Sequence, residues 1–314
     1  MSAPRVAVVI PCFNLGKFVS TAVRSAQNQG IGVEIVVIDD GSTDSETHRE
    51  LDQLLARGIT VLRTENRGLA AARNLGVSST AAPLLCMLDA DDALAPGYFK
   101  SAIDLLDRDI DLAFVSCWLQ TFGERSWQWR QDSCALQDLL DECTVCTAAI
   151  VHRSAVEAVG GFDEKMPIPG YEDWDFWISL VERGYRGAIL QEVFFFYRQR
   201  PHSMSETCCA PEGHATLSRY LIEKHRNSFE HYVVPLLVRK IHRECDLLKR
   251  TYALETQSVI AEMPMDSPKE PAASLGAHDE AAALRASLSW RITAPLRAAY
   301  ELARAPFGFF RGRP

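Results

Sequence analysis

The stretch that decides the fold is residues 6–44, VAVVIPCFNLGKFVSTAVRSAQNQGIGVEIVVIDDGSTD. It begins with an apolar, β-branched run, Val6–Pro11, continues with helical spacing over Lys17–Asn28, and ends in a second apolar run, Val33–Asp39. Short apolar runs rich in β-branched residues are typical of buried strands. The stretch therefore predicts a strand–helix–strand unit in which the two strands are parallel.

The same alternation of strand-like and helix-like segments continues to about Leu119. Further strands are expected at Ile59–Arg63, Pro83–Asp89 and Leu112–Cys117, and further helices at Glu46–Arg57, Gly68–Ser78 and Pro96–Leu106. Asp44 is expected to cap the second helix, and Pro96 suits a first helical turn. We therefore predict an α/β fold, a parallel sheet with helices on both faces, whose ligands bind beyond the carboxyl ends of the strands.

The later part of the chain is less regular. Strands are expected at Thr144–His152, near Ala188–Gln191 and at Val193–Arg198, and helices at Ser154–Val159, around Trp174–Val181 and over Leu217–Glu255. Pro235 is expected to kink or divide the last helix. We predict a main domain at residues 1–212, a helical extension at 213–261, a linker at 262–280 and a basic amphipathic tail at 281–314.

Composition narrows the class of protein. The 314 residues are 47% hydrophobic and carry a net charge of −8, which favours a folded soluble chain and argues against one that coats nucleic acid. The nine cysteines lack a small-domain disulfide rhythm, and no signal segment opens the chain. We therefore expect reduced thiols, a cytoplasmic location and no membrane-spanning segment. For Cys143 and Cys146, buried thiols are favoured over a zinc site.

Three carboxylate clusters stand at positions where such a fold binds ligands: Asp39–Asp40, Asp89–Asp92 and Glu172–Asp173. Packed carboxylates repel one another unless they are exposed or share a hard divalent cation, which also accepts substrate phosphates. No glycine-rich phosphate loop follows the first strand, so a metal held by Asp89–Asp92 would supply the missing positive charge. The alternatives are a capping, Asp-rich turn for Asp89–Asp92 and helix N-terminal acidity for Glu172–Asp173.

Four motifs in order resemble those of glycosyltransferase family 2, over roughly residues 5–205. They are Val8–Asn14, Ile38–Asp44, Asn66–Asn74 running on to Leu88–Asp92, and Tyr171–Trp177. The resemblance implies the GT-A fold, a Rossmann-like mixed sheet flanked by helices, with a C-terminal helical extension. It also implies an inverting transfer from a UDP-, GDP- or dTDP-sugar to a glycan or lipid-linked acceptor, with Mg²⁺ or Mn²⁺ as cofactor.

The resemblance also implies roles for individual residues. Asp173 would be the general base, with Glu172 beside it. Pro11 and Phe13 would line the base pocket, Asp40 would accept a hydrogen bond from the base, and Arg73 would project towards it. The nucleotide-binding residues would be Pro11, Phe13, Asn14, Asp39, Asp40, Arg73, Asp89, Ala90 and Asp91. The metal-binding candidates are Asp89, Asp91, Asp92 and His202. Arg200 stands where many relatives carry a histidine, and it or His202 would approach the leaving diphosphate.

Two features leave alternatives open. Residues 281–314 hold six Arg and one Glu with interleaved aromatic residues, and Ser287–Arg297 resembles a segment of bacterial cell-surface polysaccharide glycosyltransferases. This tail is expected to bind the inner face of the membrane, or to dock on protein. Trp118, Trp127 and Trp129 either stack on acceptor sugars or pack the core. The expected pathway makes a surface polysaccharide (O-antigen, capsule or exopolysaccharide). The competing functions are a metal-dependent nucleotidyltransferase and an inactive carbohydrate-binding or scaffolding subunit.

Overall fold

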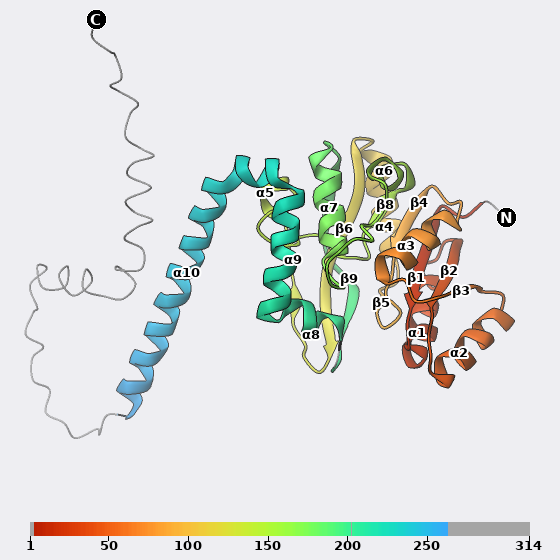
Figure 1. Cartoon of the computed structure of the whole chain (residues 1–314), viewed down its shortest axis with the longest axis horizontal. Coiled ribbons are helices and arrows are strands. Elements are labelled where there is room, and N and C mark those ends of the chain that lie inside the picture. Colours follow the sequence, from red (N-terminus) through yellow and green to blue (C-terminus); the bar gives the residue numbers. More distant parts are fainter. Residues whose placement is uncertain (1–2, 202, 263–314) are drawn as a thin grey trace, which may run out of the picture. The chain divides into compact units, whose positions relative to one another are not determined.

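The computed structural model describes residues 3–201 and 203–262 (Figure 1). The backbone divides into two units, residues 1–245 and 246–314. The fold, the cavities and the contacts discussed below belong to the first unit. Of the second unit, the structure describes the continuation of the last helix to Glu262.

Nine strands of the described residues form one sheet. They are β1 (Val6–Cys12), β2 (Val33–Asp40), β3 (Thr60–Thr64), β4 (Leu84–Met87), β5 (Ala93–Leu94), β6 (Leu112–Gly123), β7 (Gln128–Trp129), β8 (Ile150–His152) and β9 (Arg186–Gln199). Their order is β3-β2-β1-β4-β8-β6-β9-β5, and β7 pairs with β6. β1 to β4 are parallel, whereas β8 is antiparallel to both β4 and β6. The sheet is therefore mixed, as the family resemblance implies. The parallel pairing expected from the strand–helix alternation holds for β1 to β4, and β6 and β9 are also parallel.

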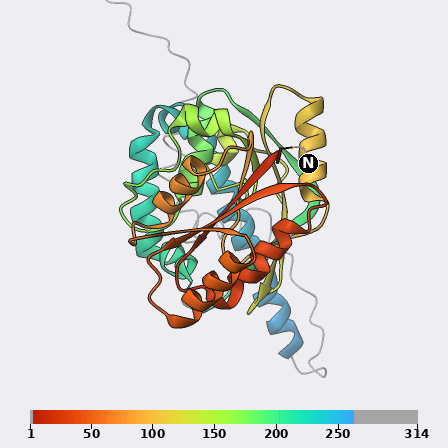
Figure 2. The same cartoon turned by 90° about the vertical axis from the view of Figure 1, so that its right-hand side faces the viewer.

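Ten helices of the described residues accompany the sheet. They are α1 (Gly16–Gln27), α2 (Ser45–Ala56), α3 (Leu69–Ser78), α4 (Tyr98–Arg108), α5 (Leu136–Leu139), α6 (Arg153–Val159), α7 (Glu172–Glu182), α8 (Met204–Cys209), α9 (Pro211–Lys224) and α10 (Arg226–Glu262). α1 and α2 pack together, and the right-handed crossover of parallel strands puts both on one face. α3 leads back from β3 to β4, so the same rule puts it on the other face. Figure 2 shows helices on both sides of the strands.

β1 lies at the centre of the parallel half and is buried along its whole length. α3 packs closely against it: a Cβ added at Gly76 would lie 2.1 Å from Cγ1 of Val9. The glycine therefore allows the helix to approach the strand. Because the chain runs outward from β1 to β3 and then returns to β4 on the other side of β1, the order reverses between β1 and β4. Ligands of open α/β sheets bind at such a switch point, beyond the strand ends.

The helix-start predictions have opposite outcomes. Asp44 caps α2 as expected, since its Oδ1 accepts the N–H of Thr47 at 2.7 Å. The prediction that Pro96 stands in a first helical turn is wrong. α4 begins at Tyr98, and Gly97, its N-cap residue, has a left-handed backbone with φ +87°.

Two strand predictions also need correction. The strand expected over 144–152 is confined to β8, its last three residues. The two strands expected between 188 and 198 form one strand, β9, which keeps pairing with β6 through register irregularities opposite Cys117–Leu119. The break that the sequence suggests is thus a local irregularity within a continuous ladder.

The C-terminal helical region breaks at a different residue from the one predicted. Pro235 lies inside α10 and does not divide it, whereas His225 separates α9 from α10 with φ −101° and ψ 30°. The predicted boundary between residues 212 and 213 falls within α9, and the first compact unit continues to Cys245. Residues 213–245 therefore belong to the first compact unit, and the predicted domain bounds stay predictions.

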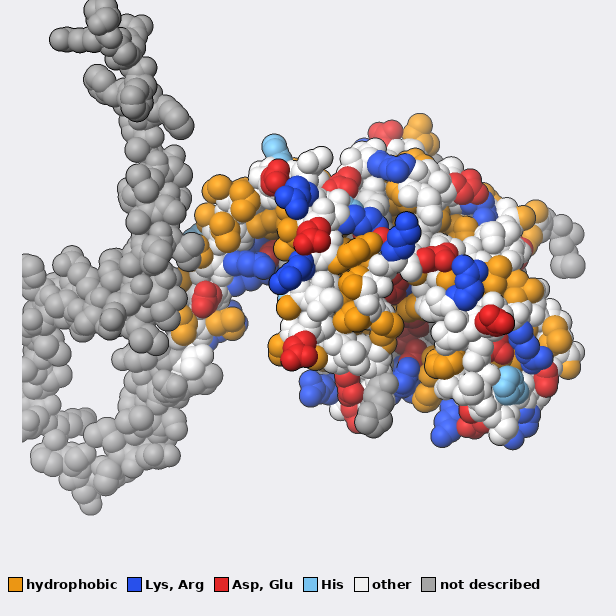
Figure 3. Space-filling view, in the orientation of Figure 1, with side chains coloured by type: hydrophobic (Ala, Val, Ile, Leu, Met, Phe, Trp, Pro, Cys, Tyr) orange, Lys and Arg blue, Asp and Glu red, His pale blue; other side chains and the backbone are white. Residues whose placement is uncertain are grey.

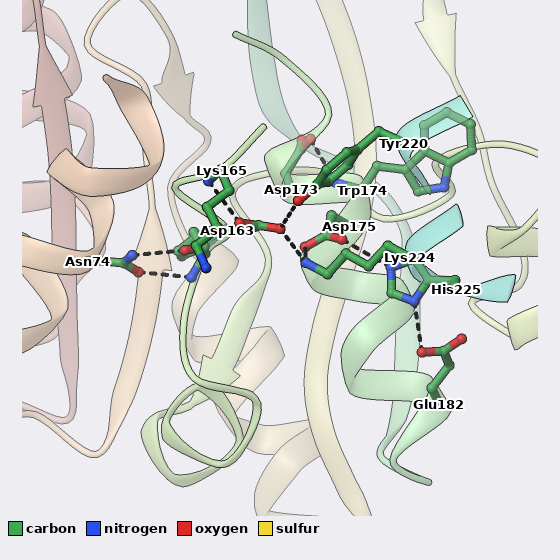
Figure 4. Close-up of polar contacts among 11 residues, drawn as sticks. Asn74, Asp163, Lys165, Asp173, Trp174, Asp175, Glu182, Tyr220, Lys224 and His225 are labelled. Atoms are coloured by element: carbon green, nitrogen blue, oxygen red, sulfur yellow. Dashed lines mark hydrogen bonds and ion pairs between the residues drawn. The ribbon is translucent and has the colours of Figure 1, made fainter. Parts of the chain in front are cut away.

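A buried polar network connects these helices to α7 (Figure 4). The ring of His225, whose side chain is 3% exposed, is hydrogen-bonded to Asp175 Oδ1 at 3.0 Å and to Glu182 Oε2 at 2.8 Å. Lys224 Nζ donates to Asp175 at 2.9 Å and to Asp163 at 2.5 Å. Burial disfavours the charged imidazolium, but the hydrogen bonds to the two carboxylates outweigh burial and raise the pKa of His225.

We predict that His225 stabilises the fold in a pH-dependent way. Because its pKa is higher in the folded state than the ordinary value of ~6.5, the stabilisation is complete below about pH 6.5 and is lost as pH rises through the folded-state pKa. The free energy of unfolding lost in His225→Gln, measured in urea, should therefore shrink as pH rises from about 5.5 to 8.5. His231→Gln is the control, because His231 is exposed on α10. A loss that does not vary with pH would contradict the prediction.

Candidate active site

A cavity of about 630 Å³ opens at the carboxyl ends of β1 and β4. The surface in Figure 3 is hollowed between the α1–α3 side and the α8–α9 side, and acidic side chains lie recessed in the hollow. Nine of the catalytic, nucleotide-binding and metal-binding candidates line the cavity: Pro11, Phe13, Asp40, Arg73, Asp89, Ala90, Asp91, Glu172 and Asp173. Arg200, Trp127 and Trp129 also line it. The fold thus brings together residues from the first and second halves of the family-like region.

Asn14 and Asp39 do not line the cavity but support the loop that borders it. Asn14 Oδ1 accepts the N–H of Thr43 at 2.8 Å, and Asp39 Oδ1 accepts the N–H of Ser42 at 2.9 Å. Asn14 has a left-handed backbone, φ 53°, which asparagine tolerates better than most residues. The structure therefore gives these two side chains a role in holding the loop after β2.

Asp92 lies behind the cavity wall. It is 1% exposed, its Oδ1 accepts the N–H of Arg198 at 2.8 Å, and its Oδ2 has no hydrogen-bond partner among the described residues. Burial raises the pKa of Asp92 well above its usual range. The metal-binding role expected for Asp92 from the sequence stays a prediction. His202, the other such candidate, lies outside the described residues.

Asp40 connects the end of β2 to the start of α3. Its two carboxylate oxygens accept the N–H groups of Arg67 at 2.8 Å and Gly68 at 2.9 Å. Gly68 is the N-cap residue of α3, so Asp40 caps the helix that carries Arg73. A carboxylate has about four acceptor positions, which leaves Asp40 able to accept further hydrogen bonds from the cavity.

Arg73 is the central cation of the cavity. Its side chain is 1% exposed and donates to Glu172 Oε1 at 2.6 Å and to Asp89 Oδ1 at 2.9 Å. Desolvation opposes its charge, but the two carboxylates outweigh desolvation and raise the pKa of Arg73. Desolvation also raises the pKa of Glu172, although Arg73 opposes this shift. The guanidinium thus joins α3 to the end of β4 and the start of α7.

Asp89 and Asp91 present carboxylates to the cavity after β4, with side chains 23% and 14% exposed. Arg200 Nε donates to Asp91 Oδ2 at 2.6 Å, while desolvation raises the pKa of Asp91. Among residues 3–201 and 203–262, no three His, Cys, Asp or Glu side chains form a metal-binding group. Mg²⁺ commonly binds through one or two carboxylates and completes its shell with phosphates and water, so Asp89 and Asp91 fit such an ion.

Asp173 faces the same cavity from the start of α7. Thr147 Oγ1 donates to its Oδ2 at 2.7 Å, and the N–H of Trp174 donates to its Oδ1 at 2.8 Å. Tyr171, just before the helix, has a left-handed backbone, φ 63°, which is uncommon for a residue other than glycine. Such strained conformations cluster at functional sites.

The sequence model of Glycosyl transferase family 2 matches residues 7–167, half of the chain. The chain belongs to this family. The minor teichoic acid biosynthesis protein GgaA of Bacillus subtilis is 25% identical over 212 residues, which cover 62% of this chain and 47% of GgaA. The chain thus spans about half the length of this curated relative.

Solved structures share the fold. S. aureus TarS in complex with UDP-GlcNAc has a TM-score of 0.58 at 17% identity, covering 69% of this chain and 66% of the TarS chain. The mannosyltransferase PcManGT from Pyrobaculum calidifontis, in complex with GDP-Man and Mn²⁺, has a TM-score of 0.53 at 18% identity, covering 95% and 85%. These likenesses confirm the predicted GT-A fold.

Two residues of this family member that the sequence pattern does not single out contribute to the cavity. Tyr171 belongs to the acidic motif of family 2, but the residue type does not reveal its left-handed backbone, because such a backbone is usually signalled by glycine. Thr147 stands 26 positions before Asp173, and no spacing rule connects the two. Only the folded chain brings them together.

We predict that Arg73 is essential for stability. Arg73→Met leaves Asp89 and Glu172 without their buried cation and should lower the free energy of unfolding by about 3–5 kcal/mol, measured in urea. The control is Arg5→Met: Arg5 pairs with Asp107, and both side chains are more than half exposed. Exposed pairs contribute about 0–1 kcal/mol. A loss for Arg73→Met no greater than that of the control would show that the buried pair is dispensable.

Proposed function

We propose that the chain transfers a sugar, with inversion, from a nucleotide-sugar donor to an acceptor hydroxyl during synthesis of a surface polysaccharide such as O-antigen, capsule or exopolysaccharide. One observation carries this proposal: Asp89 and Asp91, after β4, and Asp173, at the start of α7, line one cavity. Family 2 membership and the likeness to a teichoic acid biosynthesis protein support it. An inverting transfer needs charge neutralisation at the leaving group and a base at the acceptor, and the cavity offers carboxylates for both.

The donor nucleotide is proposed to bind at the end of β1. Phe13 is 45% exposed and lies next in sequence to the β1 end, with Pro11 also lining the cavity. An exposed aromatic ring offers a face on which a base stacks, and Asp40 keeps acceptor capacity for a base N–H. UDP-, GDP- and dTDP-sugars are the candidate donors. The TarS and PcManGT complexes with UDP-GlcNAc and GDP-Man support this donor class.

Asp89 and Asp91 are the proposed ligands of Mg²⁺ or Mn²⁺. When bound, such an ion would supply Lewis-acid neutralisation of the donor diphosphate. The Mn²⁺ in the PcManGT complex supports a divalent ion in this fold. Arg200, ion-paired to Asp91 and lining the same cavity, adds a positive charge that is held on the protein. Its guanidinium is suited to hydrogen-bond phosphate oxygens, so it would orient the leaving diphosphate.

Asp173 is the proposed general base. The carboxylate of Glu172 is 5% exposed and bonded to Arg73, whereas Asp173 is held by neutral donors, the hydroxyl of Thr147 and a backbone N–H. The acceptor oxygen bonds to the anomeric carbon of the donor while the bond from that carbon to the phosphate oxygen breaks. The proton of the acceptor passes to Asp173, and the nucleoside diphosphate leaves with the bonding electron pair. Attack opposite the leaving group inverts the anomeric configuration.

Membrane association is proposed from sequence alone. The basic, aromatic tail at 281–314 suits an anionic surface on the cytoplasmic side, and a lipid-linked acceptor would be found there. This tail lies outside the described residues. Among the described helices, none is both long and apolar enough to cross a bilayer.

We predict that nucleoside diphosphates stabilise the chain in the presence of a divalent ion and that Asp91 is required. A thermal-shift screen of UDP, GDP and dTDP with Mg²⁺ or Mn²⁺ should give a preferred ligand, because binding to the native state raises its stability by mass action. Asp91→Asn should remove the ion-dependent part of this shift. The control Asp111→Asn changes a carboxylate on the surface that is 71% exposed. An equal shift with and without the ion in the unsubstituted chain would contradict the metal site.

We predict that Asp173→Asn keeps donor binding and loses turnover. An amide of the same shape preserves the hydrogen-bonding geometry but cannot take the acceptor proton, so release of nucleoside diphosphate from the preferred donor should fall by about 10²–10⁴-fold. The assay would supply a bacterial lipid and oligosaccharide extract as acceptor. Thermal shift by the nucleoside diphosphate should match that of the unsubstituted chain. Turnover near that of the unsubstituted chain would reject Asp173 as the base.

A further inference from the structure

A second cavity, of about 400 Å³, shares part of its wall with the first. Its lining consists of Asp141, Glu142, Cys143, Tyr171, Asp173, Trp174 and His214. Three of these residues, Cys143, Tyr171 and Asp173, also line the larger cavity. Asp173 therefore stands between two separate spaces. A base in that position can take the proton of an acceptor in one space while the acceptor oxygen attacks a donor held in the other.

Aromatic side chains form one wall of the second cavity. The rings of Tyr171 and Trp174 lie 5.0 Å apart at 60°. Trp174 Nε1 donates to the carbonyl oxygen of Leu139 at 2.5 Å, which fixes the indole. The hydroxyl of Tyr171 is hydrogen-bonded to Nδ1 of His214, 2.8 Å away, an exposed residue of α9. Rings held in this way present an apolar face and polar edges. A pyranose likewise has an apolar face of C–H groups and hydroxyl groups around its edge.

The lining of the second cavity also contains the carboxylates of Asp141 and Glu142. The side chain of Asp141 is 1% exposed, and its Oδ2 lies 3.0 Å from Arg243 Nη1 and 3.6 Å from Arg239 Nη1. Glu142 is 44% exposed and accepts from Arg243 Nη2 at 3.0 Å. Because the oxygens of Asp141 are covered and ion-paired, Glu142 is the carboxylate that a ligand in this cavity reaches. Because Arg243 and Arg239 already offset the negative charge, a neutral, hydroxyl-rich ligand fits better than a cation.

We propose that the second cavity binds the acceptor as a glycan. One sugar ring would lie against Tyr171 and Trp174, a hydroxyl would donate to Glu142, and the reacting hydroxyl would reach Asp173. The acceptor class is thus a neutral saccharide whose recognition includes an aromatic face. This inference rests on the proposed function, since it assigns the donor to the larger cavity.

The test uses the full chain and two substitutions at the rim. Glu142 and His214 are side chains at the edge of the lining whose removal should leave folding intact, so the variant Glu142→Ala/His214→Ala is compared with the unsubstituted chain. Glu212→Ala is the matched control, because Glu212 is exposed on the same helix as His214 and lines neither cavity. The probe is an array of neutral oligosaccharides from bacterial surface polysaccharides, read in the presence of the preferred nucleoside diphosphate.

We expect the unsubstituted chain and Glu212→Ala to retain at least one oligosaccharide, and the double variant to retain it at least tenfold less. Thermal shift by the nucleoside diphosphate should be the same in all three proteins. Retention of no oligosaccharide by the unsubstituted chain, or equal retention by the double variant, would overturn the proposal. Trp127→Ala tests the larger cavity, which Trp127 lines: loss of retention there alone would place the acceptor in that cavity and overturn the proposal. Absence of any nucleoside diphosphate shift would instead reject the proposed function.

Discussion

The buried guanidinium of Arg73 is the interaction on which the cavity depends. It pairs with Asp89, 16 positions away, and with Glu172, 99 positions away. Without a cation between them, the two carboxylates from the end of β4 and the start of α7 would repel each other. The cation between them turns that repulsion into attraction, and its own position follows from the close contact between α3 and β1 at Gly76. Backbone packing and site electrostatics are therefore parts of one arrangement.

The carboxylates named from sequence divide into two groups once the chain is folded. Asp39 and Asp40 accept hydrogen bonds from backbone N–H groups, and Glu172 accepts one from Arg73. These three carboxylates shape the cavity. Asp89, Asp91 and Asp173 also line the cavity and accept hydrogen bonds from side chains, and the proposed chemistry is assigned to these three. Composition alone does not separate the two groups of carboxylates in this chain.

Local signals predicted much of the first half of the fold. The β-branched runs of β1 and β2 and the Asp44 cap depend on neighbouring residues, so short patterns suffice to find them. The second half depends on contacts between distant segments. β8 pairs antiparallel with β4 and β6 across long sequence separations, and His225 ends α9 where its ring meets carboxylates of α7. The resemblance of motifs named Arg73 and five carboxylates of the cavity, but it did not show that Asp92 lies outside the cavity lining or that Tyr171 borders two spaces.

The contacts of α9 and α10 bear on how a working fragment of this chain can be made. The family match ends at residue 167, so a fragment that ends near residue 212 would contain all of it. Such a fragment would lose Lys224 and His225, which neutralise Asp175, and Arg243, which neutralises Asp141. Asp175 and Asp141 would then be left without these cationic partners. A truncated chain that keeps these ion pairs must therefore extend at least to Cys245, the end of the first compact unit.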